Sequence, residues 1–146
     1  MNYHLKKFIL IFTLLFSTVI SSSPSYAEGF LSPSYAEWTK VNKDADGNTN
    51  YVDFESIRKK DEYVYWWVLS DILKPTIQGH SSSKTYNQGD CKLFRLKILS
   101  FSFHKEPMGE GTGNVSEPVE KYKGWIYPPP GSSFETTLKR VCEYAN

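Results

Sequence analysis

Oxygen-bearing side chains recur at short intervals between residues 42 and 53, in a spacing that calcium-binding loops also use. If an EF-hand loop starts at Asn42, its ligand positions are occupied by Asn42, Asp44, Asp46, Asn50 and Asp53, and its glycine position is occupied by Gly47. The match is incomplete, because Thr49 stands where an aliphatic residue is usual and Asp53 replaces the bidentate glutamate. Asparagine and aspartate are also favoured in hairpin turns. We therefore predict a hairpin turn without a metal, with calcium binding as the alternative.

A second place where side chains could do chemistry is the loop around His80, which three serines follow. A histidine base beside a serine nucleophile is a common catalytic pair, but neighbours in sequence rarely adopt the required geometry. The chain also has no Gly-x-Ser-x-Gly pattern. We predict a polar surface loop here. No acid, base and nucleophile occur together elsewhere, so we predict that the protein is not an enzyme and has no cofactor.

Cys91 and Cys142 are the two cysteines of the chain, and they are expected to meet oxidising conditions because residues 1–27 resemble an export signal. Neither belongs to a Cys-x-x-Cys pair or has a histidine close in sequence, whereas a zinc site normally needs four ligands. We predict one intramolecular disulfide, closing a loop of about 50 residues and contributing roughly 4 kcal/mol. A reactive thiol or a metal pair is the alternative.

Residues 1–27 have the three parts of a secretory signal peptide. Lys6 and Lys7 form a basic start, residues 8–20 are an apolar run, and Ala27 ends a stretch with small residues. The run is shorter than the roughly 20 residues that span a bilayer, so an uncleaved anchor is the less favoured alternative.

The cleavage signal itself is duplicated, because Ser-Pro-Ser-Tyr-Ala-Glu occurs at residues 23–28 and again at 32–37. Processing is therefore expected after Ala27 or after Ala36. No cysteine precedes Cys91, so we expect an exported protein, periplasmic, secreted or at the cell surface, without a lipid anchor. Residues 37–146 are then one domain of ordinary core size, with no membrane span after signal cleavage.

The charge balance excludes some classes of partner. The sequence has 17 basic and 16 acidic residues, and loss of the two leader lysines brings the net charge near −1. This balance gives no electrostatic signature of nucleic-acid or anionic-membrane binding.

Tyr63 to Asp71 is the densest run of β-branched and aromatic residues, and it predicts a central strand. Both phases of its alternation are apolar. One face would carry Tyr63, Tyr65, Trp67 and Leu69, and the other Val64, Trp66 and Val68.

Other strands and one helix complete the predicted elements. Residues 37–41 and 51–53 flank the hairpin turn, residues 91–104 form a long strand whose apolar phase changes midway as a bulge would cause, and residues 122–127 form a last strand. Between the long and last strands, residues 107–118 predict a mobile loop. Ser132 can cap a C-terminal helix, whose apolar face would carry Phe134, Leu138, Val141, Cys142 and Ala145.

One helix can cover only one side of such a sheet. The other face must be shielded by loops, by a second copy of the protein or by a ligand, since large exposed apolar patches mark interaction sites. We therefore hypothesise self-association, for example as a homodimer, or binding of a protein partner through the aromatic face of the central strand. The candidate residues are Tyr63, Tyr65, Trp67 and Trp66, without a choice between the two faces.

Short sequence matches spread over most of the chain resemble the bacterial surface-adhesin protein E family. They are Glu37-Trp38-x-x-Val41, Tyr51-Val52-Asp53-x-x-Ser56-Ile57, Trp67-Val68-Leu69-x-Asp71, Ser83-Lys84, Asp90-Cys91, Arg95, Met108-Gly109-x-Gly111 and Leu138-x-x-Val141-Cys142. The resemblance implies an α+β fold, in which a small antiparallel β-sheet packs against a C-terminal helix. It also implies an exported protein with a non-enzymatic role in binding host cells or extracellular-matrix proteins. The alternative is a periplasmic or secreted domain with an envelope-related role that shares only the fold.

Overall fold

The computed structural model describes residues 36–146. The expected signal peptide, residues 1–27, lies outside the described residues. Within residues 36–146, no helix is long and apolar enough to cross a membrane.

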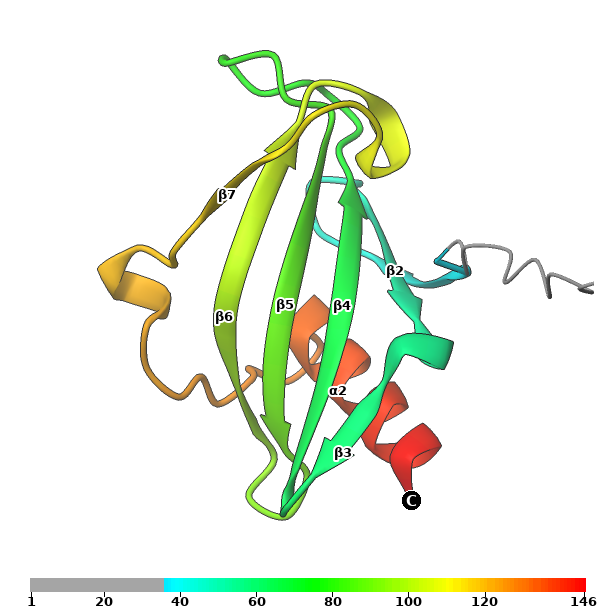
Figure 1. The fold of residues 1–146 in the computed structure, drawn as a ribbon, viewed down its shortest axis with the longest axis vertical. Coiled ribbons are helices and arrows are strands. Elements are labelled where there is room, and N and C mark those ends of the chain that lie inside the picture. Colours follow the sequence, from blue (N-terminus) through cyan, green and yellow to red (C-terminus); the bar gives the residue numbers. More distant parts are fainter. Residues whose placement is uncertain (1–35) are drawn as a thin grey trace, which may run out of the picture. The chain divides into compact units, whose positions relative to one another are not determined.

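The described residues form a seven-stranded antiparallel sheet with one α-helix, so the predicted α+β fold class is confirmed (Figure 1). The strands follow the order β1-β2-β4-β5-β6-β7, and β3 pairs with the first part of β4. Their bounds are β1 Trp38–Lys43, β2 Thr49–Asp53, β3 Arg58–Lys60, β4 Tyr63–Asp71, β5 Ser82–Asp90, β6 Arg95–His104 and β7 Asn114–Ser116. Three short 3₁₀ turns, η1 Phe54–Ser56, η2 Pro107–Gly109 and η3 Glu120–Tyr122, connect strands and precede α2, Ser133–Ala145.

Strand β4 has the predicted bounds and lies inside the sheet, between β5 on one side and β2 with β3 on the other. Its two faces are in different environments. Val64 and Trp66 are buried under α2, whereas Tyr65 and Trp67 are only partly buried on the opposite side. The alternation of the sequence therefore describes β4 correctly.

Helix α2 begins where the capping pattern predicts. The side chain of Ser132 accepts a hydrogen bond from the backbone N–H of Glu135 at 3.2 Å, and the Glu135 carboxylate accepts one from the N–H of Gly131. The buried face consists of Thr137, Leu138, Val141 and Cys142. Phe134 was predicted on this face but is 37% exposed, because it lies at the rim of the helix–sheet contact beside an apolar groove.

Strand β5 was not predicted, since its sequence is polar and has no apolar period. Gly89, which pairs with Val64 of β4, shows how this strand accommodates the buried side chains. A Cβ atom on Gly89 would lie 2.7 Å from Cζ3 of Trp66 and 2.9 Å from Cδ1 of Leu138. The strand therefore makes room for the Trp66 indole and for close approach of α2.

Cys91 and Cys142 form the predicted disulfide, across a sequence separation of 51 residues. Cys91 lies in the β5–β6 turn rather than in a strand, because β6 begins at Arg95. The predicted bulge is present in β6, where Ile98 pairs with Asn87 and Ser100 with Tyr86, leaving Leu99 as the extra residue. The disulfide thus ties α2 to the turn between two central strands.

Two predicted segments differ from the structure. Residues 107–118 contain η2 and the short edge strand β7, so the glycine-rich stretch is not a loop throughout. Residues 122–127 are not a strand, and only Ile126 makes a bridge, to Leu96 of β6. The residues on either side of that bridge, Trp125 and Tyr127, interact instead with residues of the sheet surface.

Candidate functional site on the open face of the sheet

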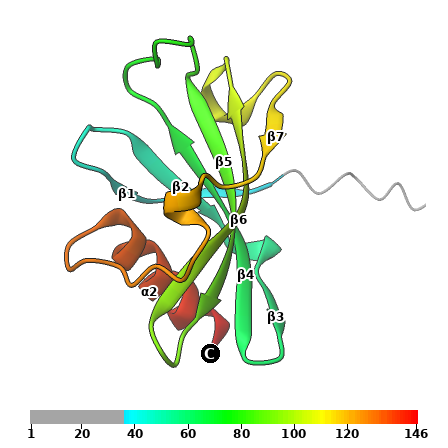
Figure 2. The same ribbon diagram turned by 90° about the vertical axis from the view of Figure 1, so that its left-hand side faces the viewer.

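Helix α2 covers one side of the sheet only. Figure 1 looks onto the other side with α2 behind the strands, and Figure 2 shows the helix on a single side. We call this uncovered side the open face, and define it by Tyr63, Tyr65 and Trp67 of β4 together with their cross-strand neighbours. Trp66 is 1% exposed under α2, so of the four candidate residues it alone lies on the covered side.

The aromatic rings of the open face contact one another across strands. Trp67 is paired with Tyr86 of β5, and their rings stack with centroids 4.8 Å apart. The ring centroid of Tyr65 lies 6.2 Å from that of Tyr86. These distances are typical of favourable aromatic pairs, which hold the rings in fixed positions on a rigid sheet.

Trp125 extends this aromatic surface from outside the strands. Its ring lies 5.7 Å from that of Tyr63, with the Arg95 guanidinium 4.3 Å and the Lys97 ammonium 4.5 Å from its centroid. Cation–π contacts of this kind hold the indole against β6. The sequence placed Trp125 in a strand and gave no sign that it joins Tyr63, because the two are far apart along the chain.

Basic side chains flank the aromatic rings. Arg58 and Lys60 of β3 are paired with Tyr65 and Tyr63, and directly opposite residues of an antiparallel pair lie on the same face. Among residues 36–146 the ion pairs are Arg95–Asp90 and Lys123–Glu120. The charges of Arg58, Lys60 and Lys97 are therefore not neutralised by an ion pair within the described part. A net charge near zero hides this local concentration.

The open face ends where η2 folds over the sheet. The backbone N–H of Met108 donates to the Asp71 carboxylate at 2.9 Å, and that of Gly109 donates to the Ser82 hydroxyl at 2.8 Å. Leu69, which shares a phase with Trp67, is fully buried beneath this turn. The accessible aromatic surface is therefore confined to the part of β4 between Tyr63 and Trp67.

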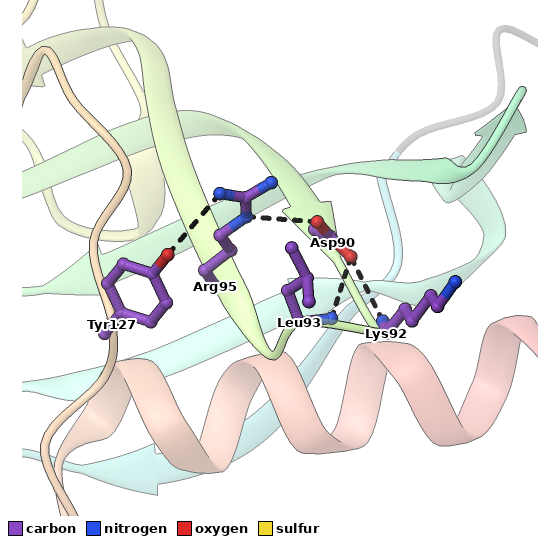
Figure 3. A network of polar contacts seen from close by, with 5 residues as sticks. All are labelled: Asp90, Lys92, Leu93, Arg95 and Tyr127. Carbon is purple, nitrogen blue, oxygen red and sulfur yellow. Dashed lines mark hydrogen bonds and ion pairs between the residues drawn. The ribbon is translucent and has the colours of Figure 1, made fainter.

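A polar network supports the border of this surface (Figure 3). Asp90 accepts a 3.0 Å charge-assisted bond from Arg95, whose guanidinium also donates to the Tyr127 hydroxyl at 3.4 Å. The backbone N–H groups of Leu93 and Lys92 donate to the same Asp90 carboxylate. The pKa of Asp90 lies below its ordinary value, first because of the Leu93 N–H and then because of Arg95, while burial opposes the shift.

The network gives a pH-dependent prediction. A carboxyl whose pKa is lower in the folded protein stabilises the fold above its unfolded-state pKa of about 3.9, and this contribution is lost as the pH falls. Asp90→Asn should therefore lower the free energy of unfolding by about 1 kcal/mol at pH 7. The gap between variant and wild type should close as the pH drops below about 4. Urea denaturation from pH 7 to pH 3 measures it, and a gap that is constant with pH would contradict the assignment.

The predicted serine–histidine alternative does not form at His80, whose ring stacks on Phe103 at 5.1 Å. A different pair exists in β6, where Oγ of Ser102 lies 2.9 Å from Nε2 of His104, and Nδ1 lies 3.2 Å from the Glu110 carbonyl. His104 is 6% exposed, and a Cβ atom on Gly113 would lie 2.3 Å from its ring. The backbone at Gly113 covers the imidazole, so the pair satisfies buried polar groups rather than facing a substrate.

The segment from Asn42 to Asp53 is the predicted β1–β2 hairpin. Asp44 uses its carboxylate within the turn, accepting from the backbone N–H groups of Asp46 and Asn48. The Asn42 side chain is engaged by α2 and by Asn50. These hydrogen bonds explain the residue types at Asn42 and Asp44 without a metal, whereas Oδ1 of Asp53 is buried without a hydrogen-bond partner. That the turn is metal-free stays a prediction.

Comparison with known proteins assigns the fold and the family. The profile described as Surface-adhesin protein E matches residues 38–143. Solved structures of Haemophilus influenzae protein E share the fold: crystal form II has a TM-score of 0.58 and 17% identity, covering 77% of this chain and 92% of that one. Another has a TM-score of 0.54 and 18% identity, covering 75% and 86%. No curated protein sequence gave a significant match.

The fold and the open face define a small α+β domain that presents aromatic and basic side chains on one side of an antiparallel sheet. The chain belongs to the surface-adhesin protein E family, as the spread of short sequence matches indicated. A surface-adhesin type of function follows from this membership, and the family name points to a binding role.

Proposed function

We propose that this protein is an exported adhesin, not an enzyme, that binds a protein of the host cell or extracellular matrix through its open face. The observation that carries the proposal is the cluster of Tyr65, Trp67 and Tyr86, which remain partly accessible on the side of the sheet away from α2. Tyrosine, tryptophan and arginine are the residues most enriched at the energetically important positions of protein interfaces.

The rigidity of the cluster, like its composition, supports a role in binding. Rings fixed by cross-strand stacking lose little conformational entropy when a partner covers them. The basic groups of Arg58, Lys60 and Lys97 beside the rings favour a partner surface with acidic side chains. Such complementarity raises the association rate and selects the orientation more than it raises affinity.

Export and self-association belong to the same proposal. The signal-peptide pattern of residues 1–27 supports export, and the absence of a cysteine before Cys91 in the sequence supports export without a lipid anchor. The open face is also suited to a second copy of the chain, because an aromatic surface without a covering element can pair with itself about a two-fold axis.

The test places a charge on the open face. Tyr65→Glu and Trp67→Glu should each reduce adhesion of expressing bacteria to cultured epithelial cells at least tenfold, since a buried unpaired carboxylate opposes the contact. Val115→Glu is the matched control, because Val115 is 77% exposed on β7, away from the aromatic cluster.

Circular dichroism of the purified variants establishes that the fold is kept. Full adhesion by folded Tyr65→Glu and Trp67→Glu proteins would show that the open face is not the binding surface. Sedimentation equilibrium separates the two kinds of partner, because a wild-type dimer that Trp67→Glu converts to a monomer assigns the face to self-association.

A further inference from the structure

A row of side chains crosses the open face from strand to strand, and a cation stands at each end of it. Arg58 of β3 is paired with Tyr65 of β4. Tyr65 is also paired with Gln88 of β5, which is paired with Lys97 of β6. Directly opposite residues of antiparallel strands lie on the same face, so the whole row lies on the open face. Lys60, two residues along β3 from Arg58, adds a third cation to this face.

The cations are spread along a line rather than gathered at one point. The four strands that carry the row lie side by side in Figure 1. Three strand spacings place the Cα atoms of Arg58 and Lys97 about 15 Å apart. A ligand that meets both ends of the row must therefore be extended and must carry more than one negative charge.

The acidic groups of the open face are engaged or lie at its border. Asp90 is in an ion pair with Arg95, and the Asp71 carboxylate accepts the backbone N–H of Met108. Glu62 lies in the β3–β4 turn, where its hydrogen bond to Tyr63 raises the pKa of that phenol. Within residues 36–146 no carboxylate forms an ion pair with the three cations of the row, so a ligand can supply the negative charge.

The two ends of the row are held in place and keep hydrogen-bond donors. Nη1 of Arg58 donates to the backbone carbonyls of Glu55 at 2.8 Å and of Ile57 at 2.9 Å. The donors on Nε and Nη2 remain for a ligand. The Lys97 ammonium lies 4.5 Å from the centroid of the Trp125 ring, a contact that restrains the side chain without using an acceptor atom. Both groups are suited to anionic oxygens, the guanidinium through paired N–H donors and the ammonium as a point charge.

A sulfated polysaccharide has the chemistry that this row requires. Arginine and lysine side chains donate hydrogen bonds and accept none, so the best partner presents acceptors along its whole length. The surface of a folded protein mixes charges of both signs, whereas sulfate esters repeat along a linear glycan and stay ionised at physiological pH. Such a chain can lie across flat strands without a cavity, and the aromatic rings beside the row offer apolar contact to its sugar rings.

We propose that the open face binds a sulfated glycosaminoglycan chain, with its sulfate groups on Arg58, Lys60 and Lys97 and its sugar rings against the aromatic cluster. This partner rests on the proposed function and narrows it, because the proteoglycans of cell surfaces and matrix are proteins that carry such chains.

Lys59 provides a matched control beside the row. It is paired with Val64, which is buried under α2, and its ammonium lies 3.4 Å from the backbone carbonyl of Ala145 at the end of the helix. The basic triplet of residues 58–60 is thus divided between the two sides of the sheet. At physiological ionic strength charges are screened over about 8 Å, so Lys59 should contribute little to a ligand on the open face.

The experiment is calorimetric titration of the purified exported protein with a short heparin oligosaccharide at physiological ionic strength. Lys60→Gln and Lys97→Gln should each weaken binding about fivefold, the effect of one surface charge pair. The double variant should lose roughly 25-fold if the two contacts are independent. Lys59→Gln should bind as the wild type does, and Lys97→Arg should keep most of the affinity. The logarithm of the binding constant should fall with the logarithm of the salt concentration, less steeply for each weakened variant.

Three results of these titrations would overturn the proposal. Equal losses in Lys59→Gln and Lys60→Gln would mean that heparin responds to net charge and not to the row. Equal affinity for heparin from which the sulfate groups have been removed would mean that sulfate is not recognised. Equal affinity for polyglutamate of the same charge would assign the face to acidic polypeptides. Circular dichroism of each variant establishes that the fold is kept.

Adhesion separates this proposal from the proposed function. Treatment of epithelial cells with heparinase and chondroitinase should lower adhesion of wild-type bacteria to the level of the Trp67→Glu variant. If the treatment changes nothing while Trp67→Glu still abolishes adhesion, the adhesin function stands and the glycan partner is wrong. If heparin binds as expected while Trp67→Glu bacteria adhere fully, the glycan site stands and the adhesin function is wrong.

Discussion

Replacement of both cysteines by alanine is expected to lower the free energy of unfolding by about 4 kcal/mol. The disulfide joins Cys91 to Cys142 across 51 residues, and a loop of this length restricts the unfolded chain strongly. In the folded protein it connects α2 to the β5–β6 turn. Small domains have marginal stability, so a loss of this size removes a large part of it.

Urea denaturation followed by far-UV circular dichroism measures the effect. A phosphine reductant should lower the denaturation midpoint of the wild type toward that of Cys91→Ala/Cys142→Ala, and it should not change the midpoint of the double variant. Equal midpoints of oxidised wild type and double variant would show that the loop constraint contributes nothing to stability.

Trp66→Ala is the second change with a large expected effect, a loss of about 3–5 kcal/mol. Trp66 is among the largest fully buried side chains; its ring lies against Gly89 of β5, and it belongs to the same core cluster as Leu138 of α2. Its removal opens a cavity that neither the sheet nor a disulfide-tied helix can close.

Trp67→Ala is the matched control, because the neighbouring tryptophan lies on the open face. Its loss should cost about 1 kcal/mol, the contribution of its stack on Tyr86. The same variant should impair adhesion while keeping the fold. Similar destabilisation by both substitutions would mean that the two faces of β4 are equally core, and the open face would then not be available for binding.

The sequence by itself determined the elements whose signals are local. The two-residue period of Tyr63 to Asp71 gave β4, Ser132 with Glu135 gave the start of α2, and the phase change in β6 gave the bulge at Leu99. The export pattern and two cysteines gave the disulfide. The strand, the helix start and the bulge depend on neighbouring residues, and two cysteines can pair within the chain in one way only. One sequence is therefore enough to predict these features.

Tertiary structure alone decided which face of β4 is covered by the helix. Both sets of alternating residues are apolar, so the alternation does not specify which set faces α2. It also decided that the polar segment Ser82–Asp90 is a strand, since this segment is held between β4 and β6 rather than by a pattern of its own. Trp125 contacts Tyr63 and Arg95, and Trp66 and the first turn of α2 line one cavity, only because the chain folds back over long distances. Contacts between residues far apart in sequence depend on the packing of whole elements, and no local propensity encodes them.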